Sequence, residues 1–458
     1  MPYFSHHIRH TKAIIPLDAT AFPAWLKKQD ARTRNWVAAQ AFQAAPQTAL
    51  LVPDAAGDIA CVLAGVEATP TLWSLAHLPA LLPGGNFYID AKWKPALLSR
   101  VALGFALAQY QFDRYKKSPR KSLVLQLPKA IDLAALAAEH AAIVLVRDLI
   151  NTPANDMGTA DLAKAARAVA KQTGAKFREI VGDDLLRENY PAIHAVGRAG
   201  SQPPRLIELT HGKAAHPLVV LVGKGVTFDT GGLDIKPYAG MRLMKKDMGG
   251  AALVLGLAQR IIAAGLPIRL RVLIPAAENS ISSNAFRPQD VIASRKGLTI
   301  EIGSTDAEGR LILADALAEG DRDNPALMID VATLTGAARA ALGTELPALY
   351  SNREEIAREL AHISLAAHDP MWPLPLWQGY AKYVSSTIAD VTNTPAYGFA
   401  GSITAALFLE RFVSPGTPWV HIDSYAWNAE SQPGRPAGGE ALGLRSLFAY
   451  LEKRFGTA

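Results

Sequence analysis

The stretch LVVLVGKGVTFDTGGLDIK, residues 218–236, joins a fully apolar, strand-like run to a loop rich in glycine, lysine and aspartate. A run such as LVVLV is typical of a central parallel strand that is covered on both faces. The loop after it holds Lys224, Asp229, Asp234 and Lys236. Since sites in parallel α/β sheets lie at the carboxyl ends of the strands, this stretch predicts a fold class and the place of a functional site.

Further strand and helix patterns alternate on its C-terminal side. Residues 248–264 read as a helix with almost no polar residues, which predicts that it is buried. Residues 268–274 read as a strand, 311–318 as a helix and 326–331 as another strand. This alternation predicts a mainly parallel central sheet with helices on both faces.

The N-terminal part has a different arrangement. Strand-like runs at 59–64 and 122–127 mix with a helical run at 95–110. Residues 131–155 are rich in alanine and leucine and read as one long helix that ends at Pro153. We therefore expect an α/β protein with a smaller N-terminal α/β domain (1–130), a linker helix (131–155) and a larger C-terminal α/β catalytic domain (156–458).

Composition narrows the class of protein. Half of the 458 residues are hydrophobic and 19% are charged, which excludes a disordered chain. Cys61 is the only cysteine, so an intramolecular disulfide and a cysteine-based zinc site are excluded. The first residues lack the pattern of a secretory signal, and no apolar run reaches the ~20 residues that span a bilayer. We expect a cytoplasmic protein without a membrane partner.

The formal net charge of +6 raises the question of nucleic-acid binding. The basic residues are scattered, and their densest groups, residues 114–121 and the pair Lys245-Lys246, are short. A solvated basic face is the favoured interpretation. Nucleic acid is therefore not expected as the main partner. Nucleic-acid binding remains a rival function, which a salt-dependent gel shift would test.

Carboxylates gather in the segments that follow the predicted strands. Asp306 and Glu308 stand two apart in STDAEGRL, residues 304–311. In an extended segment two such side chains point to the same face. With Asp229 and Asp247 they make a group of acids whose mutual repulsion a bound cation would relieve. Because histidine and cysteine are absent from the group, hard or borderline divalent ions suit it best.

Each of these residues also has a simpler interpretation. An aspartate in a glycine-rich turn is commonly a turn residue or a helix cap, and Asp247 before Met248 would serve as a cap. Glu308 and Arg310 could open a helix. Glycine-rich loops also cradle phosphates, but the chain lacks the phosphate-loop and dinucleotide-binding motifs here. A phosphoesterase that uses the same metals remains a second rival.

Taken together, the motifs GKGVTFDTGGLDIKP, KKDMGGAA, STDAEGRL and ATLTGA, in this order and spacing, resemble the leucyl aminopeptidase (cytosol aminopeptidase) family. NTPAN (151–155) and GSITAALFLERF (from Gly401) look like further family segments. The resemblance covers roughly residue 131 to the C-terminus. It implies two divalent metal ions per chain, Zn²⁺ or Mn²⁺, peptide substrates and a homohexamer.

The resemblance also implies roles for single residues. The tighter metal would be bound by Lys224, Asp229, Asp247 and Glu308, and the exchangeable one by Asp229, Asp306 and Glu308. Lys236 and Arg310 would be catalytic without binding metal, Arg310 holding a bicarbonate, and Met244 and Thr333 would lie near the pocket for the first side chain. The reaction implied is removal of the N-terminal residue from peptides with a free α-amine, through a hydroxide that bridges the metals.

The chain departs from the family pattern in two places. Ser304 stands where the family usually has asparagine before Thr-Asp-Ala-Glu, and the stretch HIDSYAWNAESQPGRPAGG lacks an HLDIAG-type continuation. These departures leave the implied metal ligands in place. They put the substrate pocket and any preference for leucine in question.

Overall fold

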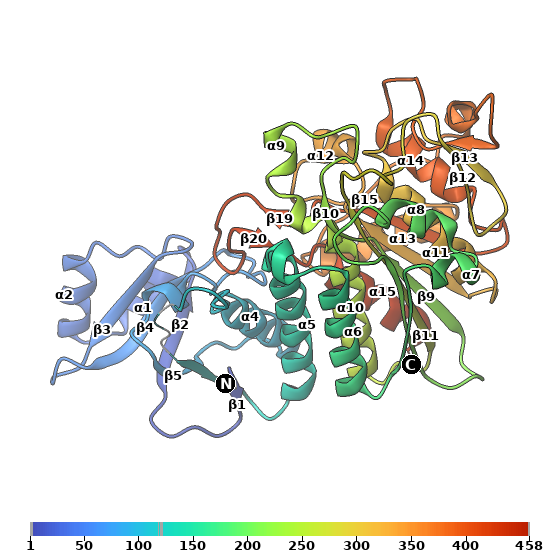
Figure 1. The fold of residues 1–458 in the computed structure, drawn as a ribbon. Helices are drawn as coiled ribbons and strands as arrows, with labels where there is room; N and C mark the ends of the chain where they lie inside the picture. The colour runs from blue at the N-terminus through green and yellow to red at the C-terminus, as the bar shows by residue number, and fades with distance from the viewer. Residues whose placement is uncertain (1–2, 118, 120–121, 457–458) are drawn as a thin grey trace. The chain divides into compact units, whose positions relative to one another are not determined.

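The computed structural model describes residues 3–117, 119 and 122–456, and the chain divides into two compact units. The first contains residues 1–144 and 430–437, and the second contains residues 145–429 and 438–458. The long helix α5 (Leu133–Asn151) runs from the first unit into the second, which confirms the helix predicted before Pro153 (Figure 1). The predicted domain boundaries at 130 and 155 stay a prediction. The basic stretch 114–121 lies partly outside the described residues.

The first unit is built on a six-stranded sheet in the order β1-β6-β5-β2-β4-β3. All neighbouring strands are parallel except β3 and β4. The strands are β1 (Phe4–Ser5), β2 (Lys12–Leu17), β3 (Ala49–Pro53), β4 (Ile59–Gly65), β5 (Gly85–Ile89) and β6 (Leu123–Gln126), and the helices α1 (Ala21–Lys27), α2 (Ala31–Ala39), α3 (Leu78–Leu81) and α4 (Pro95–Leu107). The predicted runs 59–64, 122–127 and 95–110 are confirmed as β4, β6 and α4.

The second unit is built on a nine-stranded sheet. Its central strands β18 (Trp419–Asp423), β14 (Leu327–Ala332), β9 (Leu218–Gly223) and β11 (Arg269–Asn279) are mutually parallel, and β10 (Gly225–Asp229) pairs parallel with β11. Antiparallel pairings join β15 (Ala348–Ser351) at one side and β8 (Arg205–His211) and β7 (Lys176–Val181) at the other, and β16 (Trp372–Pro373) completes the β15 edge. The predicted strands 218–222, 268–274 and 326–331 are confirmed at the centre of a mainly parallel sheet.

Helices cover both faces of this sheet (Figure 1). A Cβ on Gly223 of β9 would lie 2.5 Å from Val254 of α10 (Gly249–Ala263), and one on Gly320 of α11 (Glu308–Asp321) would lie 2.8 Å from Val220. Since Val220 and Gly223 point to opposite faces of the strand, α10 and α11 lie on opposite faces. The helix predicted at 248–264 is confirmed as α10, buried from Gly249 to Ile261 as its apolar sequence requires.

The remaining elements complete the two faces and the rim of the second unit. Its other helices are α6 (Thr159–Thr173), α7 (Asp184–Arg187), α8 (Pro191–Gly197), α9 (Tyr238–Met241), α12 (Gly336–Leu342), α13 (Glu354–Ala366), α14 (Gly401–Glu410) and α15 (Leu444–Phe455), with 3₁₀ turns η1 (Ala154–Asp156), η2 (Met244–Met248) and η3 (Gln378–Val384). Small sheets join β12 (Val291–Ala293), β13 (Thr299–Glu301) and β17 (Val391–Thr392), and β19 (Trp427–Asn428) with β20 (Gly438–Gly439). Within the described ranges, no helix has both the length and the apolar character that crossing a bilayer requires.

Candidate active site

The predicted site residues meet at the carboxyl ends of the central strands. Lys224 directly follows β9, Asp229 ends β10 and Thr333 directly follows β14. The helix α10 can approach these strand ends because Gly250 has no side chain: a Cβ there would lie 2.0 Å from the carbonyl oxygen of Val331. The close packing brings η2, which carries Asp247, against the ends of the strands.

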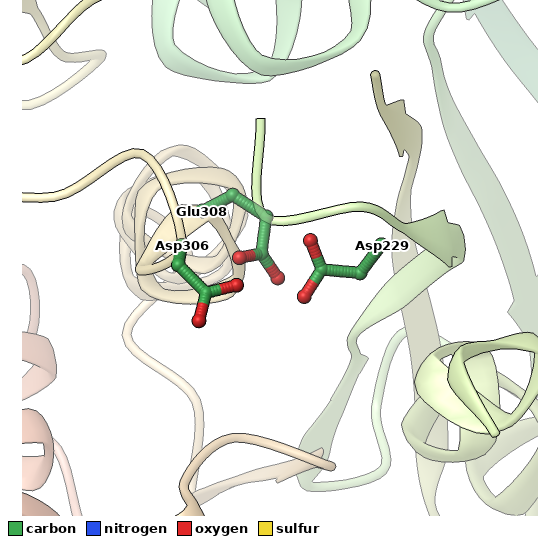
Figure 2. Close-up of side chains that lie close together, drawn as sticks. All are labelled: Asp229, Asp306 and Glu308. Atoms are coloured by element: carbon green, nitrogen blue, oxygen red, sulfur yellow. The ribbon is translucent and has the colours of Figure 1, made fainter. Parts of the chain in front are cut away.

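Three carboxylates point toward one another at the centre of the site (Figure 2). Asp229, Asp306 and Glu308 each offer an oxygen, and these oxygens all lie within 4.8 Å of one another. Asp229 and Glu308 are buried, whereas Asp306 is partly open to solvent. Such spacing is suited to a divalent cation shared by several carboxylates.

Lys224 lies between the carboxylates of Asp247 and Glu308. The Nζ atom of Lys224 lies 2.7 Å from Asp247 Oδ2 and 2.9 Å from Glu308 Oε1, and it donates a hydrogen bond to the carbonyl oxygen of Thr333 at 3.1 Å. Asp247 is held in turn by the hydroxyl of Thr333, which donates to Oδ1 at 2.7 Å. Lys224, Asp247 and Glu308 are therefore adjacent, and their role as metal ligands stays a prediction.

The other predicted lysine faces the open side of the cluster. Lys236 Nζ lies 2.8 Å from Asp229 Oδ2 and also forms an ion pair with Asp306. Its backbone N–H donates to the carbonyl oxygen of Thr230, which closes the loop around Gly231 and Gly232. The ammonium group of Lys236 therefore lines the cavity and contacts the carboxylates of Asp229 and Asp306.

Burial and mutual repulsion oppose ionisation of the carboxylates. Burial, followed by the charge of Asp229, raises the pKa of Glu308 to about 8, although Lys224 acts in the opposite direction. Burial likewise raises the pKa values of Asp247 and Asp306 above their ordinary range. A cation of higher charge than an ammonium group would relieve this repulsion.

Both lysines are held in their charged form by the same acids. Burial alone would lower the pKa of Lys224, but Asp247 and Glu308 outweigh it and raise the pKa above its ordinary value. The pKa of Lys236 is raised in the same way, with Asp229 as the main opposing charge. The two ammonium groups serve as internal counter-ions for the four carboxylates.

The donor set fits divalent metal ions. Asp247 Oδ2 and Glu308 Oε1 are buried and lie within ion-pair distance of Lys224, yet neither accepts a well-aligned hydrogen bond from any group in the described part of the chain. Buried carboxylate oxygens with unused lone pairs are suited to ligate a cation. Lys224 itself would have to lose its proton to join them as a ligand.

One expectation about local geometry is wrong. Asp306 and Glu308 were expected in an extended segment, but Asp306 lies in a turn and Glu308 is the first residue of α11. The turn is held by Thr305, whose hydroxyl donates to Gly231 O at 2.6 Å and whose N–H donates to Asp234 Oδ2 at 2.7 Å. The helix start therefore aims Glu308 inward, as the alternative interpretation of this residue allowed.

Two asparagines that the sequence interpretation did not single out support the cluster. Asn279, at the end of β11, donates through Nδ2 to Asp229 Oδ1 at 2.8 Å and to Thr305 O at 3.1 Å. Asn393 accepts from the N–H groups of Gly303 and Ser304 through its Oδ1. Neither asparagine carried a local signal, because Asn279 follows the polar Glu278 at the end of β11 and Asn393 directly follows β17.

Arg310 lies behind the cluster on α11. Its side chain is buried, it donates to the carbonyl oxygen of Asn393, and its Nε has no hydrogen-bond partner in the described ranges. Burial lowers the pKa of the Arg310 guanidinium to about 10. A buried guanidinium with an unused donor is suited to hold a small anion.

The cluster opens into a cavity of about 490 Å³. Met244 of η2 and Thr333 both line it, and their place near a pocket for the first side chain stays a prediction. Lys246 lines it too and is only 4% exposed, so the solvated interpretation is wrong for this residue. Burial lowers the pKa of Lys246 to about 8. Lys245 is half-buried and donates to the carbonyl oxygen of Asn151 at 2.7 Å.

Comparison with known proteins agrees with this geometry. A model of the cytosol aminopeptidase family, catalytic domain, matches residues 144–448, and one of the M17 aminopeptidase N-terminal domain matches residues 13–128. A probable cytosol aminopeptidase of Syntrophotalea carbinolica is 42% identical over 369 residues, which are 76% of this chain and 74% of the relative.

Two solved structures share the whole fold. The crystal structure of cytosol aminopeptidase from Coxiella burnetii has a TM-score of 0.96 at 48% identity, covering 99% of both chains. The bottromycin maturation enzyme BotP in complex with Mn has a TM-score of 0.87 at 32% identity, covering 96% of this chain and 99% of that one.

The fold and the carboxylate–lysine cluster define the class: a metal-dependent peptide hydrolase. Within that class the chain belongs to the cytosol aminopeptidase family. Its activity is accordingly that of an aminopeptidase, with both family domains present.

Proposed function

We propose that the chain removes the N-terminal residue from peptides whose α-amine is free. The convergence of Asp229, Asp247, Asp306 and Glu308 at the mouth of one cavity carries this proposal, because it supplies a metal-binding centre beside a space for a substrate. The family relationship supports the reaction type.

Two divalent ions would be held by residues of this chain. Lys224, Asp229, Asp247 and Glu308 would hold the tighter ion, and Asp229, Asp306 and Glu308 the exchangeable one. When bound, the ions would supply Lewis-acid chemistry: they would lower the pKa of a shared water until hydroxide is available as the nucleophile, and they would polarise the scissile carbonyl group. Mn²⁺ and Zn²⁺ both suit the site, and the Mn complex of BotP supports the first.

Lys236 and Arg310 would act on the substrate without binding metal. Lys236 stands at the edge of the cavity, so its ammonium group would stabilise the negative charge that develops on the carbonyl oxygen as water attacks. Arg310 also lines the cavity, and its unused Nε donor supports a role in holding a bicarbonate that accepts the proton of the water and returns it to the leaving amine.

Met244 and Thr333 would border the pocket for the first side chain. Both line the cavity, and Thr333 donates its hydroxyl to the Asp247 carboxylate. Thr333 would therefore orient a metal ligand as well as limit the size of the side chain that enters. Met244, which is unbranched and flexible, would adapt to side chains of different shape.

We also propose a homohexamer and a cytoplasmic location. The hexamer rests on the family resemblance, and the location is supported by the names of relatives described as cytosol aminopeptidases. Nucleic acid is not proposed as the main partner, in keeping with the scattered basic residues.

The deciding experiment compares three substrates with Mn²⁺-loaded enzyme: leucine p-nitroanilide, its N-acetylated form and p-nitrophenyl phosphate. The proposal expects turnover of the first alone, because only the first has both a scissile amide and a free amine. Hydrolysis of the phosphate ester without the anilide would replace the peptidase by a phosphoesterase. Equal turnover of the acetylated anilide would remove the requirement for a free amine.

A further inference from the structure

Lys246 is a buried cation that the charges of Asp247 and Asp423 influence but with which neither carboxylate forms an ion pair. Its side chain is 4% exposed, and no ion pair or side-chain hydrogen bond involves it within residues 3–117, 119 and 122–456. It contacts an aromatic ring: the Nζ atom of Lys246 lies 4.4 Å from the ring centre of Tyr425. This contrasts with Lys224 and Lys236, which each contact two carboxylates.

A second cation lies beside the same ring. The guanidinium carbon of Arg339, on α12, lies 5.3 Å from the ring centre of Tyr425, and within the described ranges Arg339 forms no ion pair. Lys246, Arg339 and Tyr425 all line the cavity that holds the carboxylate cluster. The lining of the cavity therefore holds a pair of cations, here called the cationic wall, in addition to the acidic cluster.

An unpaired buried cation lowers the stability of the folded chain, because burial removes the water that solvates its charge. The ring of Tyr425 offsets a part of that cost through a cation–π contact. The remaining deficit has a simple resolution if an anion enters the cavity during the working cycle. Lys246 follows Met244 by two residues on η2 and directly precedes Asp247, so such an anion would lie next to the reacting groups.

We propose that Lys246 and Arg339 form a cationic wall that binds a carboxylate of the peptide substrate. This inference rests on the aminopeptidase activity proposed above and names the class of peptide that the cavity selects. Two groups of a peptide have this chemistry: an acidic side chain on the first residue, and the C-terminal carboxylate of a dipeptide. Both cations lie beside the ring of Tyr425. Tyr425 is part of HIDSYAW, which belongs to the stretch where the sequence departs from the pattern usual in the family.

Two matched substrate pairs test the proposal and separate the two sources. Glutamyl p-nitroanilide and glutaminyl p-nitroanilide have the same shape and differ in the charge of the first side chain. Leucyl-glycine and leucyl-glycinamide differ in the charge of the C-terminus. The quantity compared is the ratio of kcat/KM, charged over neutral, within each pair.

We expect wild-type enzyme to prefer the charged member of at least one pair. Lys246→Met should lower that ratio about ten- to hundred-fold, the scale of one lost charge-assisted hydrogen bond, and Arg339→Met, which is exposed, at most about five-fold. Lys246→Arg should retain the preference because it keeps the charge. Lys213→Met, on an exposed loop, is the matched control for net charge and should leave both ratios unchanged.

If Lys246→Met changes the kcat/KM ratio of the glutamyl and glutaminyl pair alone, the cationic wall binds the first side chain. If it changes the ratio of the leucyl-glycine pair alone, the wall binds the C-terminal carboxylate. The proposal is overturned if wild-type enzyme shows no charged preference in either pair, a measurement that needs no variant. It is also overturned if Lys246→Met, folded by its melting temperature, slows both members of each pair equally. Failure of the aminopeptidase proposal looks different, because wild-type enzyme would then cleave none of these amides.

Discussion

Lys224 Nζ lies 2.9 Å from Glu308 Oε1 because the residue that follows Glu308 is a glycine. A Cβ on Gly309 would lie 2.5 Å from Lys224 Cε and 2.7 Å from Nζ, so any larger residue would push the lysine out of the cluster. The site therefore depends on the absence of one methyl group in the first turn of α11.

Gly309→Ala should separate activity from stability. Alanine favours a helix over glycine by about 0.5–1 kcal/mol, while its Cβ displaces the Lys224 side chain. We expect a loss of bound metal and of kcat with no matching loss of melting temperature in metal-free protein. Gly336→Ala, also in the first turn of a helix and with open space around its Cβ, is the control for the helix effect. Wild-type metal content in Gly309→Ala would contradict the steric argument.

Glu308→Ala and Lys236→Ala should fail in different ways. Glu308 is proposed to bind both metals, so its loss should remove activity and lower bound metal together. Lys236→Ala should keep metal near two per chain and reduce kcat by about 10²–10³-fold, the scale of losing one charge-stabilising donor. Lys236→Gln should lie between Lys236→Ala and wild type. Metal analysis and kcat on the same preparations decide, and wild-type kcat in Lys236→Ala would refute its role at the carbonyl oxygen.

Chelation should abolish peptidase activity, and Mn²⁺, Co²⁺ or Zn²⁺ should restore it with a different turnover for each. The reason is that the cluster offers carboxylates and an amine but no thiolate, so at least one ion should exchange readily. Elemental analysis and activity are measured before and after dialysis. Full activity in protein shown to be free of metal would refute the two-metal interpretation.

The buried pair Arg147–Glu440 should make the second unit sensitive to acid. Burial alone would raise the pKa of Glu440, but Arg147, 2.9 Å away, outweighs it and holds the pKa below its ordinary value of 4.5. A depressed pKa means that the pair contributes its stability above about pH 4.5, and that this contribution is lost as the pH falls through the pKa of the folded state.

Glu440→Gln should therefore lower the free energy of unfolding at pH 7, on the order of 3–5 kcal/mol, and with it the melting temperature, because it removes the carboxylate charge that lies 2.9 Å from the buried Arg147 guanidinium. The difference from wild type should shrink toward pH 4, which is below the ordinary pKa of 4.5, because the unfolded wild-type chain then binds a proton more readily than the folded one. Glu355→Gln, an exposed change of the same charge, should show no such convergence. Parallel melting curves for wild type and Glu440→Gln at both pH values would contradict the assignment.

Light scattering of active enzyme at micromolar concentration should give the mass of six chains. The expectation comes from the family resemblance, and the measurement should be made on the preparation whose activity is known. A monomer with full activity would refute the homohexamer as the working form.

The central part of the fold was predictable because its signals are local. The apolar run of β9 and the all-round apolar sequence of α10 each specify a buried element without reference to the rest of the chain. The antiparallel edges β7, β8 and β15 were not predicted, because strand direction depends on pairing between distant segments. The start of α11 at Glu308 was missed for a similar reason, since Thr305 holds the preceding turn through partners more than seventy residues away.

The candidate site likewise contains residues that could be predicted from the sequence and residues that could not. Asp229, Asp247, Asp306 and Glu308 could be grouped from the sequence because repeated acids beside strand ends are visible there, and the resemblance gave their roles. The burial of Lys246 could not be predicted, because the ring that covers it, Tyr425, comes from a distant segment. Asn279, at the end of β11, and Asn393 stabilise their neighbours through amide groups that no local pattern distinguishes from those of other polar residues.

The placement of Lys224 and Lys236 among the carboxylates has a consequence for the order of events in the life of the protein. Two ammonium groups balance part of the negative charge of the carboxylates, so we expect the acids to stay gathered even when no metal ion is bound. Folding of the chain should therefore not require metal. Metal loading would then be a separate stage after folding, with a rate set by metal supply and by how fast the lysines leave the carboxylates.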